Sequence, residues 1–103
     1  MTLDNKSKYH LAKGFDCLLT GKLETAMGEM GRASNLSRCE FTNLCREGTA
    51  LYYMGKYRDA LTCYQKAFIR TDNSDLKLLI DMSMDNIRAD LKLSEFPESG
   101  VEG

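Results

Sequence analysis

The sequence predicts an all-α fold made of two antiparallel helical hairpins and one further helix near the C-terminal end. Within Leu44–Ala67, bulky and small side chains follow one another at spacings of three and four residues around a Gly-Lys pair. Residues at these spacings lie on one face of an α-helix. The pattern also occurs 34 residues earlier in the chain. The helical spacing and the repeat together indicate two copies of one hairpin.

Small residues and turns keep the two copies in register. The identical pairs are Gly14 and Gly48, Gly21 and Gly55, Lys22 and Lys56, Ala26 and Ala60, and Ala33 and Ala67. Side chains this small let paired helices approach closely, and glycine can take the left-handed backbone conformation that ends a helix. Each Gly-Lys pair is therefore expected to form the turn of a hairpin.

Five helices are expected in chain order. They cover about residues 4–19, 23–34, 38–54, 57–70 and 75–93. Asp4 or Asn5 can cap the first helix, because either side chain can accept a hydrogen bond from a free backbone amide. The second helix is expected to be the least stable, since Gly28 and Gly31 each cost about 1 kcal/mol relative to alanine in a helix interior. The alternative is that these glycines admit a close neighbour.

The third and fifth helices also carry start signals. Ser37, with Glu40 three residues later, fits a capping box at the start of the third helix. Asn73 or Ser74 is expected to cap the fifth helix, which has no partner helix after it. In helical repeats a terminal helix with one polar face closes the open end of the core, and we expect this role for the fifth helix.

A period of 34 residues is that of the tetratricopeptide repeat, and both copies resemble this family. The second copy matches it at Leu44, Gly48, Leu51, Gly55, Tyr57, Ala60, Tyr64 and Ala67. It departs at Glu47, where the family prefers an apolar residue, and at Asp72, where proline usually closes the repeat. The resemblance implies a right-handed α-α superhelix in which the first helix of each repeat lines a concave groove.

On this resemblance we expect residues 1–93 to form one domain. It consists of repeat one (about 7–40), repeat two (about 41–74) and the capping helix (about 75–93). Residues 94–103 are acidic and poor in apolar side chains, so we expect a disordered tail there.

Composition and charge exclude several classes of partner. The net charge of −1 and isoelectric point of about 5.8 give no basic face for a nucleic acid. No apolar run approaches the ~20 residues needed to cross a bilayer, and the N-terminal residues do not resemble a signal peptide. The four cysteines, Cys17, Cys39, Cys45 and Cys63, have no CxxC spacing. We therefore expect reduced thiols and an intracellular, cytoplasmic location.

The sequence contains no pattern typical of catalysis. His10 is the only histidine, and Cys17 lies two turns further along the same helix, ~10 Å away along its axis, too far for a nucleophile pair. Closely spaced zinc ligands and glycine-rich phosphate loops are missing. We therefore expect no enzymatic activity, no metal and no cofactor, and we interpret His10 as a partly buried or surface side chain.

The resemblance places a peptide-binding groove on the first helix of each repeat and on the fifth helix. Its positions are Lys8, Leu11, Phe15, Leu18, Cys45, Arg46, Thr49, Tyr52, Tyr53, Leu79 and Ser83, with Thr42, Leu76 and Ile80 beside them. The alternative for the leucines is that they pack between helices. For Tyr52 and Tyr53 the groove is favoured, because a tyrosine combines an apolar face with a hydroxyl group that needs a partner.

The residues of this groove also indicate its ligand. One subtype of the family binds acidic C-terminal tails of heat-shock chaperones with lysine and asparagine side chains. Leu11, Phe15, Cys45 and Thr49 stand at those positions here, so we expect an apolar or amphipathic segment of another protein. The predicted function is a non-enzymatic adaptor. The alternatives are a small chaperone for an aggregation-prone subunit, similar to type III secretion chaperones, and a self-associating architectural module that forms a homodimer.

Overall fold

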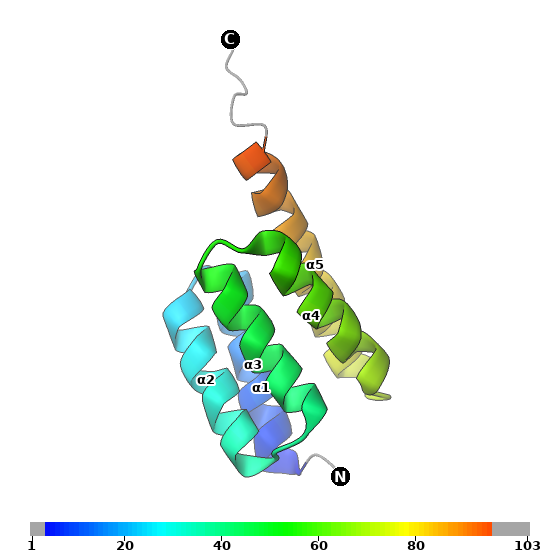
Figure 1. Cartoon of the computed structure of the whole chain (residues 1–103). Coiled ribbons are helices and arrows are strands. Elements are labelled where there is room, and N and C mark those ends of the chain that lie inside the picture. Colours follow the sequence, from blue (N-terminus) through cyan, green and yellow to red (C-terminus); the bar gives the residue numbers. More distant parts are fainter. Residues whose placement is uncertain (1–3, 96–103) are drawn as a thin grey trace.

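The computed structural model describes residues 4–95 and confirms the all-helical prediction, since it contains helices and no strand within that range. The helices are α1 (Asn5–Leu19), α2 (Leu23–Leu36), α3 (Glu40–Tyr53), α4 (Tyr57–Arg70) and α5 (Ser74–Glu95). α1 packs along α2 and α3 packs along α4, and the two resulting hairpins meet where α2 contacts α3 (Figure 1).

The two hairpins have the same turn. Gly21 and Gly55 both adopt a positive φ, of 84° and 80°, a conformation that glycine takes without steric cost. In each turn the amide of the following lysine donates over 2.8 Å to a carbonyl near the end of the preceding helix, from Lys22 to Cys17 and from Lys56 to Leu51. The Gly-Lys pairs are therefore the helix-ending turns that the sequence predicts.

Small residues bring the paired helices together in both hairpins. Gly14 lies against the side chain of Met30, and Gly48 lies against the ring of Tyr64. A Cβ atom built on either glycine would approach these side chains to 3.1 and 3.0 Å, closer than ordinary van der Waals contact, so the neighbouring side chain would have to move. The alanines of the repeat, Ala26, Ala33, Ala60 and Ala67, are all fully buried. The 34-residue period thus corresponds to equivalent contacts in the two hairpins.

Two of the predicted helix starts are confirmed. The Asp4 carboxylate accepts a 2.7 Å hydrogen bond from the Ser7 amide at the start of α1. The Asn73 side chain accepts one of 3.0 Å from the Leu76 amide at the start of α5. Both side chains satisfy backbone donors that have no partner within the helix.

The predicted capping box at Ser37 is wrong. α2 continues to Leu36, two residues beyond its expected end, and α3 begins at Glu40 after Cys39. The Thr42 hydroxyl accepts from the Cys39 amide (3.3 Å) and donates to the Ser37 carbonyl (2.6 Å). Thr42 therefore supplies the side-chain bond that we expected from Glu40.

The C-terminal helix is longer than expected, because Ser94 and Glu95 belong to α5. The remainder of the predicted acidic tail, residues 96–103, lies outside the described residues.

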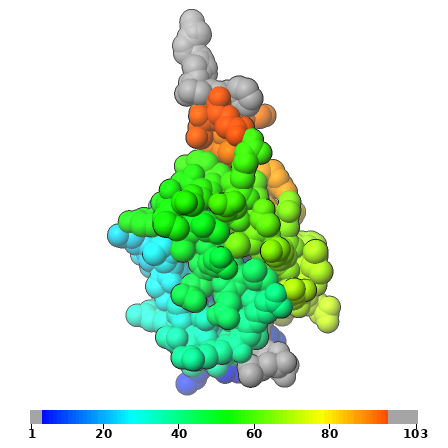
Figure 2. Space-filling view, viewed as in Figure 1, coloured from blue at the N-terminus to red at the C-terminus, as the bar shows by residue number. Residues whose placement is uncertain are grey.

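α5 packs against α4 and also against α1, the first helix of the chain. Its inner face, formed by Leu76, Ile80, Met84 and Ile87, joins the same apolar core as the inner face of α1. The five helices therefore enclose one core, which differs from an array open on its concave side. In the space-filling view α3 and α4 cover much of the face toward the viewer, and α5 is seen only at their edge (Figure 2).

Candidate binding site

Most of the predicted groove residues are buried in the core. Leu11, Phe15, Leu18, Cys45, Thr49 and Ser83 are fully buried, as are Thr42 and Ile80, while Tyr52 is 5% exposed and Leu76 is 3% exposed. α5 contacts α1 and covers the side of that helix that the resemblance leaves open. The prediction that these side chains line an accessible groove is therefore wrong for this arrangement, and the alternative that the leucines pack between helices holds for Leu11 and Leu18.

The polar groups of these residues are satisfied within the chain. The Tyr52 hydroxyl donates to the Asp90 carboxylate and accepts a 3.3 Å hydrogen bond from the Asn86 amide, and both partners lie on α5. Burial together with the Asp90 hydrogen bond raises the pKa of Tyr52. The Thr49 hydroxyl donates to the Cys45 carbonyl over 2.9 Å. None of these groups is free to bind a ligand.

The four accessible members of the predicted set lie in separate places. Lys8 and Leu79 are partly exposed and line one hollow between α1 and α5. Tyr53 is 47% exposed, and its hydroxyl donates to Glu24 over 3.1 Å. Arg46 is exposed and lines a different hollow, between α2 and α3. The structure thus does not bring these four residues together into one site.

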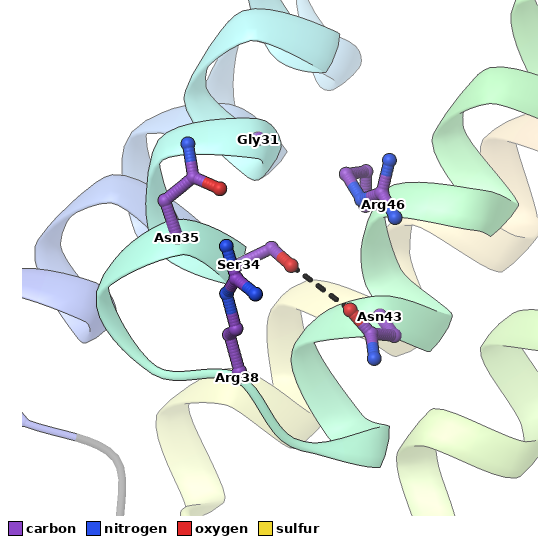
Figure 3. A pocket seen from close by; sticks show the side chains of 6 residues that line it. All are labelled: Gly31, Ser34, Asn35, Arg38, Asn43 and Arg46. Carbon is purple, nitrogen blue, oxygen red and sulfur yellow. Dashed lines mark hydrogen bonds between the residues drawn. The ribbon is translucent and has the colours of Figure 1, made fainter.

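The hollow between α2 and α3 is a polar pocket of about 480 Å³. Its lining residues are Gly31, Ser34 and Asn35 on α2, Arg38 on the connection, and Asn43 and Arg46 on α3 (Figure 3). The spacings of three and four residues place each helix's contributions on one face. The pocket therefore lies where the two hairpins meet, and we name it the inter-hairpin pocket.

The charges of the inter-hairpin pocket are unbalanced. Each of the other arginines in the chain, Arg32, Arg58, Arg70 and Arg88, forms an ion pair with a carboxylate. Within residues 4–95, Arg38 and Arg46 form none, and no lining residue of the pocket is acidic. The two arginines that lack a carboxylate thus line the same pocket.

A buried hydrogen bond orients one amide in this pocket. Ser34 is 7% exposed, and its hydroxyl donates to Asn43 Oδ1 over 2.9 Å (Figure 3). Because the oxygen of the Asn43 amide accepts this bond, its NH₂ group remains as a donor. The pocket therefore offers the guanidinium groups of Arg38 and Arg46 together with an oriented amide.

Such a set of donors suits an anion. Guanidinium groups bind carboxylates and phosphates with two parallel hydrogen bonds, and the volume of the pocket lies within the usual range for ligand sites. Nucleophilic catalysis by the Ser34 hydroxyl would need an adjacent general base, and the six lining residues provide none. Residues 4–95 also hold no cluster of three or more metal-binding side chains.

The histidine belongs to a buried charge cluster between α1 and α2. Glu29 is 4% exposed, and its carboxylate lies 2.6 Å from His10 Nδ1, 3.2 Å from Arg32 and 3.9 Å from Lys13. The His10 hydrogen bond, with the charges of Lys13 and Arg32, holds the pKa of Glu29 below its usual value. His10 thus compensates a buried carboxylate, in line with our interpretation of it as a partly buried side chain.

Sequence reasoning missed five of the six residues of the inter-hairpin pocket. Gly31 was predicted to weaken a helix, and Asn35 was assigned to a connector. Nothing within 4 Å would meet a Cβ atom at Gly31, so this glycine leaves space in the pocket. A usable signal was available, because the polar residues of α2 and α3 recur at helical spacing on both sides of the connection.

Comparison with known proteins gave no match to a family model, to a curated protein or to a solved structure. No helix within residues 4–95 combines the length and the apolar character that a membrane span requires.

Proposed function

We propose that this chain is a non-enzymatic protein-interaction module of the tetratricopeptide type, which binds an acidic segment of a partner protein in the inter-hairpin pocket. The observation that carries the proposal is the position of Arg38 and Arg46. They are the arginines without a carboxylate partner within residues 4–95, and both line this pocket.

The repeat supports the first part of the proposal. The 34-residue period and the equivalent glycine contacts of the two hairpins are typical of helical-repeat proteins, whose common role is to bind other proteins. The fold provides a rigid frame for the pocket, since the inner face of α2 is buried at Ala26 and Ala33 and that of α3 at Leu44 and Cys45.

The ligand of the proposal differs from the apolar segment expected from the sequence. The apolar side chains that were to bind it are buried beneath α5, whereas the accessible pocket is polar and cationic. Two guanidinium groups and the Asn43 amide can donate to the carboxylates of successive aspartate or glutamate residues. An acidic peptide is therefore the partner chemistry that fits these donors.

The proposal can be tested by fluorescence anisotropy with a labelled hexaglutamate peptide as the probe. We expect Arg38→Ala/Arg46→Ala to weaken binding by about tenfold or more, because each charge-assisted hydrogen bond contributes about 1.5–3 kcal/mol. Arg58→Ala/Arg70→Ala removes the same charge from exposed arginines outside the pocket and serves as the control. Equal losses of affinity in both variants would show that the peptide binds by non-specific electrostatic attraction, and this result would refute the proposal. The absence of peptide binding by wild type would also refute it.

A second pair of variants tests the place of binding without changing any charge. Gly31→Met directs a side chain into the pocket, whereas Gly28→Met adds the same side chain one turn earlier on α2, at a position that does not line it. Neither added Cβ atom meets a neighbour within 4 Å, so both variants are expected to fold. Only Gly31→Met should weaken peptide binding. If both variants bind the peptide as wild type does, the site lies elsewhere.

A further inference from the structure

The outer face of α5 carries an apolar stripe. Leu78, Met82 and Leu93 are 59%, 44% and 68% exposed, and Ala89 lies in line with them. Their spacings of four, seven and four residues place them on one side of the helix. The inner side of α5 is also apolar, since Leu76, Ile80, Met84 and Ile87 are buried in the core. A helix that is apolar on two sides is typical of one that is covered on both.

Charged residues run along one flank of this stripe in a particular order. They are Asp81, Asp85, Arg88 and Lys92, all exposed and separated by four, three and four residues. This spacing keeps the four side chains on one flank of the helix. The two acidic residues come first and the two basic residues follow, so the charge along the flank reverses at the middle of the helix.

We propose that the outer face of α5 docks a second copy of this chain, with the two α5 helices antiparallel about a two-fold axis near Asn86. In this arrangement, Asp81 faces Lys92 of the second copy, and Asp85 faces its Arg88. The same axis brings Leu78 against Leu93 and the long side chain of Met82 against the small Ala89. Charges and apolar residues thus match about one centre, as a two-fold interface requires.

The charge order distinguishes this pairing from the alternative. In a parallel two-fold pair, the charged flank of one copy would face the opposite flank of the other, so the contacts of Asp81 with Lys92 and of Asp85 with Arg88 would not form. The antiparallel pair forms four opposite-charge contacts, two on each side of the axis. Asp85 and Arg88 already form an exposed ion pair of 3.0 Å within the chain, and in the dimer both side chains gain a second partner.

The dimer face is independent of the inter-hairpin pocket. All residues of the pocket lie on α2, α3 and the connection between them, whereas α5 packs against α4 and α1. In Figure 1, α5 lies behind α4 at the edge of the bundle, away from α2. A result against either proposal therefore leaves the other unaffected.

Sedimentation equilibrium across low to high micromolar concentration tests the proposal on the full chain. Wild type should form a concentration-dependent dimer. A basic variant, Asp81→Lys/Asp85→Lys, and an acidic variant, Arg88→Glu/Lys92→Glu, should each raise the dimer dissociation constant by about tenfold or more through like-charge repulsion. An equimolar mixture of the two variants should restore dimers, since each supplies the charge that the other lacks.

Two further variants complete the test. Asp16→Lys/Glu47→Lys introduces the same charge change at exposed sites on α1 and α3 and should dimerise as wild type does. Leu78→Ala/Leu93→Ala leaves every charge in place and should weaken the dimer by about tenfold or more through lost apolar burial. The proposal is overturned if wild type stays monomeric at every concentration, if the α5 variants dimerise like wild type, or if the mixture remains monomeric.

Discussion

The two hairpins place different side chains against equivalent glycines, and this difference predicts opposite effects of one substitution. In the first hairpin, a Cβ atom at Gly14 would lie 3.1 Å from Met30 Cε. In the second, a Cβ atom at Gly48 would lie 3.0 and 3.1 Å from the ring atoms Cε1 and Cζ of Tyr64. Met30 is flexible and can move its end. Tyr64 is a planar ring, fully buried, and its hydroxyl is hydrogen-bonded to Thr49.

The net effect of each substitution is the sum of two contributions. Replacing glycine by alanine inside a helix gains about 1 kcal/mol. Forcing an extra methyl group into a packed core costs about 1–3 kcal/mol. For Gly48→Ala both contributions apply, so the free energy of unfolding should fall by up to about 2 kcal/mol. For Gly14→Ala the thioether can yield, so the free energy of unfolding should stay the same or rise by up to about 1 kcal/mol.

Urea denaturation followed by circular dichroism measures both free energies of unfolding. Gly28→Ala, whose added Cβ atom meets nothing within 4 Å, gives the helix-propensity gain alone and calibrates the comparison. In a Tyr64→Met background the second hairpin has the glycine contact of the first, and the cost of Gly48→Ala should fall by about 1 kcal/mol or more. Equal effects of Gly14→Ala and Gly48→Ala, with no change in that background, would refute the reasoning.

Two more predictions concern buried polar groups. Because the folded pKa of Glu29 is lowered, its ionised form stabilises the fold above the ordinary pKa of about 4.5; this contribution is lost as the pH falls through the lowered pKa. The difference in melting temperature between wild type and Glu29→Gln should therefore shrink on acidification, and a constant difference would contradict this account. Tyr52→Phe should destabilise the fold by about 1–3 kcal/mol, since it leaves the Asp90 carboxylate without its hydroxyl donor, whereas Tyr53→Phe at an exposed site should change stability by less than about 0.5 kcal/mol in the same denaturation experiment.

The helices and hairpins could be predicted because their signals are local. Gly21 and Gly55 have the positive φ that ends a helix, and α4 has the bounds that the sequence indicates, Tyr57–Arg70. The start of α3 was missed for a local reason as well. α3 begins two residues later than a cap at Ser37 would set it, so Thr42 instead of Glu40 stands three residues after the capping residue, and its hydroxyl accepts from the Cys39 amide.

The position of α5 and the binding pocket could not be predicted, because both depend on contacts between distant residues. The apolar period of α5 identifies its buried side but not the helices that this side covers. Its contact with α1 decides whether Leu11 and Phe15 line a groove or fill the core. Likewise, no sequence pattern indicates that Arg38 and Arg46 have no carboxylate partner among residues 4–95. Whether each arginine forms an ion pair depends on where the fold places the acidic side chains around it.

The stability of α5 on the core also decides where a partner can bind. Opening the groove would expose Leu76, Ile80, Met84 and Ile87, which are buried against the rest of the bundle. At about 1.5–3 kcal/mol for each side chain, the cost is about 6–12 kcal/mol, which approaches the whole stability of a domain of this size, about 5–15 kcal/mol. A peptide that binds with micromolar affinity has a binding free energy of about 8 kcal/mol. The cost of displacing α5 would cancel most or all of this binding free energy. Recognition is therefore expected at surfaces that are accessible with α5 in place. The inter-hairpin pocket offers the two arginines that have no carboxylate partner within residues 4–95, and the outer face of α5 offers the apolar stripe.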